Sequence, residues 1–354
     1  MMTNSLKSEI RPNFLDWAKA LGIFLVIFGH YAGVLKIPFS TNNFLWYNTY
    51  NVTLFHMPLF FIIAGMLFKV RPIKEEFKKG VYGLMIPYFL ISVICLIVYT
   101  IIKTVSVNEF IKMIIGILSG YDFFHYGDFE KISGALWFVW SLFCIKIAIS
   151  LYYHLIKIKK HLLAYGIMVL CFITAIITIF KGAVFPFRID SSSIGLLFFI
   201  IGFKGKNYFE KINLVNLKYL LSILGIALIV LAISIYFNID YDDIHSKPSI
   251  NWCLWGNNFI LYVISGISGT VMIFSLSRLI SGFKNNIIMN ISNGTMIILG
   301  FNFLLYSFFD GIIKSDNFFI AVLFSLFILF LSYIIIILAK KYLPILLDGK
   351  IVKI

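Results

Sequence analysis

Charged side chains interrupt the first strongly apolar segment of this chain, and their spacing limits what the chain can fold into. The segment reads FLDWAKALGIFLVIFGHY over residues 14–31 and contains Asp16, Lys19 and His30. On an α-helix, Lys19 and His30 project within about 20° of each other and lie roughly 16 Å apart along the axis, with Asp16 beside them. Ionisable groups cost several kcal/mol in hydrocarbon, so we expect this row to face a bundle interior or a wet cavity.

Long uncharged runs recur along the whole chain and predict an all-α, polytopic integral membrane bundle. Hydrophobic residues make up 60% of the 354 residues and charged residues only 13%, which excludes a soluble globular protein. Ten segments meet or approach the length of about 20 apolar residues that spans a bilayer. These predicted spans lie near residues 14–34, 49–68, 81–102, 133–156, 162–180, 189–204, 218–238, 256–277, 286–309 and 317–339. Residues 1–354 are therefore expected to form a single transmembrane domain.

The placement of Lys and Arg sets the expected orientation. With ten spans and both termini in the cytoplasm, the inner segments carry 20 of these residues and the outer segments carry eight, as the positive-inside rule requires. The sixth span is short, but its removal would invert every later loop, so we retain it. The net charge of +14 is thus explained by topology. Nucleic acid is not expected as a partner, because no soluble basic surface is present to bind it.

The remaining polar features lie mainly in the predicted outer loops. The connection over residues 103–131 contains VNEFIKMIIGIL, which reads as a short helix lying in the membrane interface. Outer loops carry most of the varied polar side chains, which favours an acceptor site reached from outside. No metal site or disulfide framework is expected, since the cysteines lie in or at the edge of apolar runs without suitable spacing. They are Cys95, Cys144, Cys171 and Cys253.

Five ordered motifs resemble the membrane acyltransferase family 3, which contains polysaccharide O-acetyltransferases. LDWAKALGIFLVIFGH has that family's basic residue, ten intervening residues and histidine, with Lys19 where many members have arginine. The others are FHMPLFFIIAGMLF (55–68), MIPYFL (85–90), ALWFVWSLF (135–143) and FPFRIDSSSIGLLFFIIGFKGK (185–206). The likeness covers roughly residues 11–206 and is greatest to the sugar O-acetylase branch, the fucose O-acetylase-like proteins. One departure is Asn302, which stands where many members end the ninth span with a histidine.

The resemblance implies an acyl-CoA donor, acetyl-CoA or another acyl-CoA, and a carbohydrate acceptor. The acceptor would be a surface polysaccharide or its lipid-linked precursor, and the location a bacterial plasma membrane. With a cytoplasmic donor, Lys19 lies near the inner face and His30 near the outer face, a separation comparable to an extended pantetheine arm.

Four residues are candidate catalytic groups. His30 is the only neutral-pH base in its span and would act as a general base or carry the acyl group transiently. Lys19 would hold a phosphate or polarise a thioester carbonyl. Asp16 either takes part or only forms an intrahelical ion pair with Lys19. His56, at about the depth of His30 in the second span, is either catalytic or a packing residue beside Pro58.

Further candidates would bind the two substrates. The expected acceptor-binding residues are Trp137, Arg188, Asp190, Glu130 and Asn302. Structural alternatives remain open for several of them: Trp137 could anchor at the interface, Arg188 and Asp190 could simply pair, and Asn302 could hydrogen-bond between helices. The expected cofactor-binding residues are Lys19, Arg71, Lys78 and Lys79. The last three belong to a basic run that is more simply a topology determinant, with attraction to CoA phosphates as the alternative.

Two other functional classes remain open. An exporter or flippase of a glycan would equally have ten spans and intramembrane charges. A non-catalytic membrane subunit associated with polysaccharide-synthesis proteins could retain the fold with altered residues such as Asn302. The ordered motifs, together with the lack of a repeat between the two halves of the sequence, favour the acyltransferase.

Overall fold

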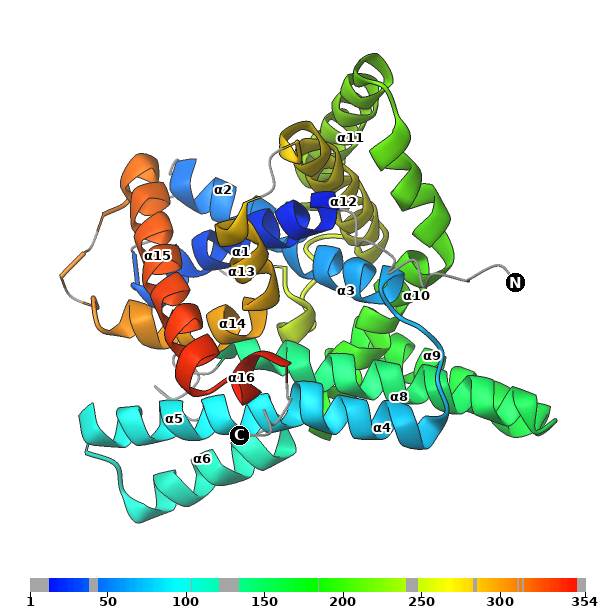
Figure 1. The fold of residues 1–354 in the computed structure, drawn as a ribbon, viewed down its shortest axis with the longest axis horizontal. Helices are drawn as coiled ribbons and strands as arrows, with labels where there is room; N and C mark the ends of the chain where they lie inside the picture. The colour runs from blue at the N-terminus through cyan, green and yellow to red at the C-terminus, as the bar shows by residue number, and fades with distance from the viewer. Residues whose placement is uncertain are drawn as a thin grey trace, which may run out of the picture.

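Helices form almost all of the described chain (Figure 1). The computed structural model describes residues 13–37, 44–102, 104–120, 134–183, 185–239, 248–282, 285–310, 312–313 and 315–348. Strand-type pairing in these residues is limited to one bridge between Ser249 and Leu254. The all-α class predicted from the sequence is therefore confirmed. A bilayer offers no water to unpaired backbone groups, and helices satisfy those groups internally.

The described residues contain nine helical segments long and apolar enough to cross a membrane, or ten if one bent pair counts as a single span. The helices of these spans are α1 (Asn13–Val34), α2 (Phe44–Thr53), α3 (His56–Met66), α4 (Ile73–Gly80), α5 (Ile86–Ile102), α8 (Trp137–Lys157), α9 (His161–Lys181), α10 (Ile189–Lys211), α11 (Leu217–Asn238), α12 (Phe259–Ile280), α13 (Asn286–Asn293), α14 (Thr295–Ser307) and α15 (Phe318–Tyr342). The protein is thus a multi-pass membrane protein.

Shorter elements connect or extend these helices. They are the π-helical segment η1 (Val81–Met85), the helices α6 (Val107–Ser119) and α16 (Ile345–Asp348), and the 3₁₀ turns η2 (Gly134–Leu136), η3 (Pro186–Arg188), η4 (Ile212–Leu214) and η5 (Ile250–Trp252). Because η1 joins α4 to α5 without a break, the third span begins at Ile73, ahead of the predicted start at residue 81. The weakest predicted span, near 189–204, is the full helix α10, which continues past Lys204 to Lys211.

Two spans are broken, which hydropathy did not predict. α2 and α3 are separated at Leu54 and Phe55, just before Pro58, whose missing N–H removes one helical hydrogen bond. α13 and α14 meet at Gly294 with a bend of 79°. A Cβ atom on Gly294 would overlap the side chain of Ile336 in α15, so this side chain would have to shift if a larger residue replaced the glycine.

The amphipathic segment predicted to lie in the interface is helix α6. Ser106 caps its first turn: its hydroxyl accepts from the backbone N–H of Glu109, whose carboxylate accepts from the backbone N–H of Ser106 at 2.9 Å. This bond lowers the pKa of Glu109 below its usual value. The far end of α6 is held against α5, since the Tyr88 hydroxyl donates to the carbonyl oxygen of Ile117 at 2.9 Å.

The core of the bundle lies around α1 and α3. α1 packs against α3, α12, α13, α14 and α15, and α3 packs most closely against α10. Glycines allow that last approach, because a Cβ on Gly65 would overlap the carbonyl oxygen of Phe199, and one on Gly202 would overlap that of Ile62. Small residues at helix contacts are usual in membranes, where packing rather than water exclusion holds helices together.

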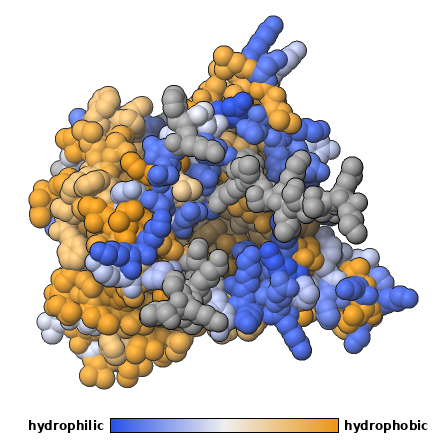
Figure 2. Space-filling view, viewed as in Figure 1, coloured by the Kyte–Doolittle hydropathy of each residue, from blue (hydrophilic) through white to orange (hydrophobic). Residues whose placement is uncertain are grey.

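One face of the molecule is polar. In Figure 2, hydrophilic side chains gather over α4 and around α13, whereas hydrophobic side chains cover the edge formed by α5, α6 and α15. Between α3 and α4 this face is hollowed, and the surface inside the hollow is hydrophobic. We refer to this side as the α4 face. The start of α1, the end of α3 and the end of α8 lie at the same end of the bundle, where α4 begins, because α1 runs antiparallel to α3 and α8 packs against α4.

Candidate active site

The charged row on α1 faces protein rather than lipid. Asp16, Lys19 and His30 are each half-buried, and their contacts come from other helices of the bundle. The two residues nearer the α4 face meet α13, and His30, nearer the other end, meets α3 and α14. The inward orientation expected from the helical spacing is therefore what the structure shows.

Asp16 and Lys19 both contact Ser292, near the bend between α13 and α14. The Ser292 hydroxyl donates to Asp16 Oδ1 at 2.6 Å, and Lys19 Nζ donates to the Ser292 carbonyl oxygen at 3.5 Å. Ser292 lies in the last turn of α13, where carbonyl groups lack helical partners and a cation is favoured. Both charged side chains therefore also have a structural role, since they tie the end of α13 to α1.

Two histidines meet farther from the α4 face. The rings of His30 and His56 lie edge to face with centroids 6.1 Å apart, and Phe303 packs against His30 with centroids 4.6 Å apart. His56 is only 5% exposed. Helices α1, α3 and α14 thus bring the two imidazoles predicted as catalytic groups into one enclosed place.

The break between α2 and α3 fixes the tautomer of His56. Its Nδ1 lies 2.8 Å from the carbonyl oxygen of Val52. A carbonyl oxygen can only accept, so Nδ1 carries the proton and donates. In the neutral ring the lone pair is then on Nε2, the atom that can accept a proton. The interrupted helix therefore orients His56 as a base.

Trp137 is buried among aromatic side chains, and its contact with an acceptor stays a prediction. It is 8% exposed, and its ring lies 6.3 Å from that of Phe61 in α3. The neighbouring Phe138 contacts both Phe60 and Phe61. The start of α8 and the middle of α3 are therefore joined by aromatic contacts that lie about one helical turn from His56 along α3.

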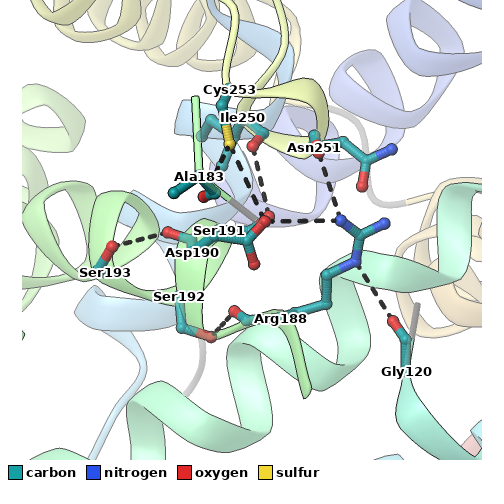
Figure 3. A network of polar contacts seen from close by, with 10 residues as sticks. All are labelled: Gly120, Ala183, Arg188, Asp190, Ser191, Ser192, Ser193, Ile250, Asn251 and Cys253. Atoms are coloured by element: carbon teal, nitrogen blue, oxygen red, sulfur yellow. Dashed lines mark hydrogen bonds and ion pairs between the residues drawn. The ribbon is translucent and has the colours of Figure 1, made fainter. Parts of the chain in front are cut away.

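Arg188 and Asp190 form a buried network that joins three segments (Figure 3). Arg188 is 4% exposed and Asp190 is fully buried, with Nη1 and Oδ2 3.9 Å apart. The Arg188 guanidinium also donates to the carbonyl oxygens of Gly120 and Asn251, each at 3.3 Å. The network thus links the end of α6, the start of α10 and the turn η5.

Serine and cysteine side chains complete this network. The Ser191 hydroxyl donates to the carbonyl oxygen of Ile250 at 3.3 Å, and that of Ser193 to the carbonyl oxygen of Asp190 at 2.7 Å. The Cys253 thiol lies 3.9 Å from Asp190 Oδ2. Burial raises the pKa of Cys253 to about 12, so the thiol keeps its proton and can donate to the carboxylate.

The ion pair Arg188–Asp190 is not beside the histidines. Gly195 of α10 packs on Phe61 of α3. Asp190 precedes Gly195 by five residues, and His56 precedes Phe61 by five residues, so Asp190 and His56 lie at a similar depth. However, five residues correspond to about 140° around a helix, which turns Asp190 away from α3. The observed contacts of Arg188 and Asp190 hold loops together, and acceptor binding by the two residues stays a prediction.

Asn302 lies in the interior of the bundle. It is fully buried and shares a helix face with Tyr306, whose hydroxyl donates to the carbonyl oxygen of Ile27 and contacts Ser325 of α15. The next residue, Phe303, is the one that faces His30. Neither of the amide atoms of Asn302 has a hydrogen-bond partner among the described residues.

The basic residues of the α4 face differ in their surroundings. Arg71 Nη1 lies 3.0 Å from Glu76 Oε2, and its Nε lies 3.7 Å from Glu75 Oε1. Lys78 and Lys79 are exposed in the last turn of α4. Arg71 is therefore held by carboxylates, while the two lysines are open to solvent. Glu130 lies outside the described residues.

Two residues of this region have no recognisable signal in the sequence. Ser292 has no distinguishing pattern, and its contact with Asp16 could be found only from the fold. Glu76 looks like one more charge in a basic run, yet it is only 2% exposed. No group of three or more His, Cys, Asp or Glu side chains that could hold a metal ion occurs among the described residues.

Comparison with known proteins agrees with this architecture. The model of a family described as an acyltransferase domain, acyltransferase family 3, matches residues 13–339, nearly the whole chain. No curated protein and no solved structure matches the chain.

Proposed function

Because the chain belongs to the acyltransferase family 3, we propose that it moves an acyl group, acetyl in the first instance, from acyl-CoA to a carbohydrate hydroxyl. The acceptor would be a surface polysaccharide or its lipid-linked sugar precursor, as in the sugar O-acetylase branch of the family, and the setting a bacterial plasma membrane. The observation that carries this proposal is the enclosed pair of imidazoles formed by His30 and His56.

The reaction needs a base where the acceptor hydroxyl meets the thioester. His30 would take the hydroxyl proton while the oxygen attacks the thioester carbonyl carbon. The C–S bond then breaks, and the CoA thiolate leaves and recovers a proton from the imidazolium. His56, with its lone pair on Nε2, would accept or return that proton beside His30. An acyl group carried briefly on His30 is the alternative route to the same products.

The direction of approach follows from charge. Hydrophilic side chains gather on the α4 face, which includes the basic helix α4, and basic loops favour the cytoplasmic side. A cytoplasmic donor would then enter through the hollow between α3 and α4 and pass Lys19 on its way to His30. The acceptor would arrive from the opposite side.

A glycan transporter is the second candidate, and one observation favours it. The corner between α13 and α14 is a discontinuous helix beside the charged residues Asp16 and Lys19, an arrangement also used in transporter sites. Release of free thiol from acetyl-CoA separates the two functions, because a transporter liberates no CoA.

The test compares His30→Ala with a histidine variant outside the bundle core. Membranes containing each protein receive acetyl-CoA and a panel of sugar acceptors, and acceptor-dependent thiol release is measured. We expect His30→Ala to lower the rate by about 10²-fold or more, the usual contribution of a general base. The matched control is His161→Ala, because His161 is exposed at the start of α9. Wild-type rates from His30→Ala, at equal protein in the membrane, would rule out the proposed chemistry.

A further inference from the structure

Lys146, in the membrane-spanning helix α8, has no direct partner among the described residues. Lys146 is half-buried in α8, and it forms no hydrogen bond or ion pair with any residue that the structure describes. Charged side chains inside membrane helices are normally paired, or they face a cavity where a ligand or water meets them. The sequence also marks this residue, because it is the only charge in the apolar run over 132–156.

The charged groups around Lys146 give this site a net positive charge. Those that act on its ammonium group are Glu76, Lys79 and Arg71. The one carboxylate among them, that of Glu76, is 2% exposed and already hydrogen-bonded to Arg71 at 3.0 Å. Arg71 also pairs with the exposed carboxylate of Glu75 at 3.7 Å. Three cations therefore face two carboxylates, which offset part of their mutual repulsion and leave a net positive charge at the α4 face.

The helix contacts show where Lys146 points. Phe143 of α8 lies against Gly80 of α4, and Phe138 of α8 lies against Phe60 of α3. Around the helix, Lys146 projects about 60° from Phe143 and about 80° from Phe138, on the arc between them. Its side chain is thus directed toward the space between α3 and α4.

Depth along the bundle puts Lys146 in line with the charged row of α1. Phe138, Phe60 and Gly22 form one layer across α8, α3 and α1. Lys146 lies eight residues from that layer toward the α4 face, which is about 12 Å at the helical rise. Lys19 lies three residues from the layer on the same side, which is about 4.5 Å. His30 is eight residues the other way, also about 12 Å. The order is therefore Lys146, Lys19, His30.

We propose that Lys146, together with Arg71 and Lys79, binds phosphate groups in the nucleotide part of the acyl-CoA donor. Glu76 is a positioning residue that holds Arg71 beside them. This inference rests on the proposed function and adds the place where the donor is anchored. The thioester end of the donor would then extend past Lys19 toward His30. The same phosphate chemistry is found in anionic lipid head groups, so the experiment must separate these two sources.

Two donors that differ only in phosphate make the test specific. Acetyl-CoA and acetyl-pantetheine present the same thioester, but acetyl-pantetheine lacks the nucleotide and its phosphates. For Lys146→Met we expect KM for acetyl-CoA to rise about 10- to 100-fold, the value of a charge-assisted phosphate contact. KM for acetyl-pantetheine should stay within about twofold of wild type. Lys146→Arg should restore KM for acetyl-CoA, since it keeps the charge.

A lysine of the same helix provides the control. Lys157 is exposed at the last residue of α8, and Lys157→Met should leave both KM values unchanged. An equal rise of KM for both donors in Lys146→Met would overturn the proposal. So would a rise that occurs in nanodiscs of anionic lipid and not in nanodiscs of neutral lipid, since the site would then belong to a lipid head group.

Binding of CoA separates this inference from the proposed reaction. Equilibrium dialysis of wild-type protein and Lys146→Met with CoA measures the anion site without any transfer. Weaker binding by Lys146→Met supports the site, even if wild-type protein transfers no acyl group and the proposed reaction is wrong. Equal binding by the two proteins overturns the site, even if transfer is observed.

Discussion

At the scale of single residues, His56 shows how a helix interruption can prepare a chemical group. At the break the carbonyl oxygen of Val52 accepts two hydrogen bonds, one from the backbone N–H of Phe55 at 3.2 Å and one from His56 Nδ1 at 2.8 Å. The bond from Nδ1 removes one tautomer and leaves Nε2 as the basic atom. If His56 only stabilised the break between α2 and α3, it would need Nδ1 alone. A substitution can therefore separate this structural role from a role as a base.

The substitution His56→Asn makes that separation. The asparagine amide N–H can replace Nδ1–H at the Val52 carbonyl, but the variant has no group in place of Nε2. We expect acyl transfer to fall by about 10²-fold, with a free energy of unfolding within about 1 kcal/mol of wild type because the hydrogen bond is kept. Thiol release and thermal melting in detergent measure the two effects. Full activity in His56→Asn would show that His56 is only structural.

The sequence predicted some of these residue relationships and not others. The eleven-residue spacing of Lys19 and His30 was enough to place them on one face, because helical geometry is local. Their partners were out of reach: Ser292 is 276 residues from Asp16, and only tertiary packing brings them together. The burial of Arg188 was likewise hidden, since it depends on carbonyl groups contributed by Gly120 and Asn251.

At the scale of helices, hydropathy located the spans but not the places where they break. The run over 286–309 contains no proline, and its corner at Gly294 depends on how closely Ile336 of α15 approaches. The break before His56 had a better signal in Pro58, yet proline is also tolerated in straight membrane helices. Any sufficiently apolar helix is stable in lipid, whether it is straight or bent. The sequence pattern alone therefore cannot show where a span bends to bring Ser292 to α1.

The contact between α3 and α10 gives a prediction at this scale. A methyl group introduced by Gly202→Ala would overlap the carbonyl oxygen of Ile62, so the two helices must move apart. We expect a loss of about 1–3 kcal/mol of stability, seen as a lower melting temperature in detergent. Gly166→Ala in α9 is the control, because a Cβ there meets nothing within 4 Å. Since alanine is the better helix former, Gly166→Ala should be neutral or stabilising. Equal melting temperatures for the two variants would contradict the tight contact.

At the scale of the whole molecule, the polar α4 face and the count of basic residues support the same orientation. Inner segments of the proposed topology carry 20 Lys and Arg residues against eight in the outer ones. Lys78 and Lys181 are both exposed, the first on α4 and the second at the end of α9. The proposed reaction depends on this orientation, because the proposed acyl-CoA donor is cytoplasmic and would reach Lys146 first.

Cysteine labelling from one side of the membrane tests the orientation. A membrane-impermeant maleimide should label Lys78→Cys in inside-out vesicles and Lys181→Cys in right-side-out vesicles, since the reagent reaches only the outward-facing surface of each vesicle. The wild-type chain measures the background from its own four cysteines, two of which are buried. If the two variants exchanged their patterns, the α4 face would be extracytoplasmic, and a cytoplasmic donor could not enter by the hollow between α3 and α4. Labelling of both variants from the same side would instead contradict an odd number of spans between residues 78 and 181.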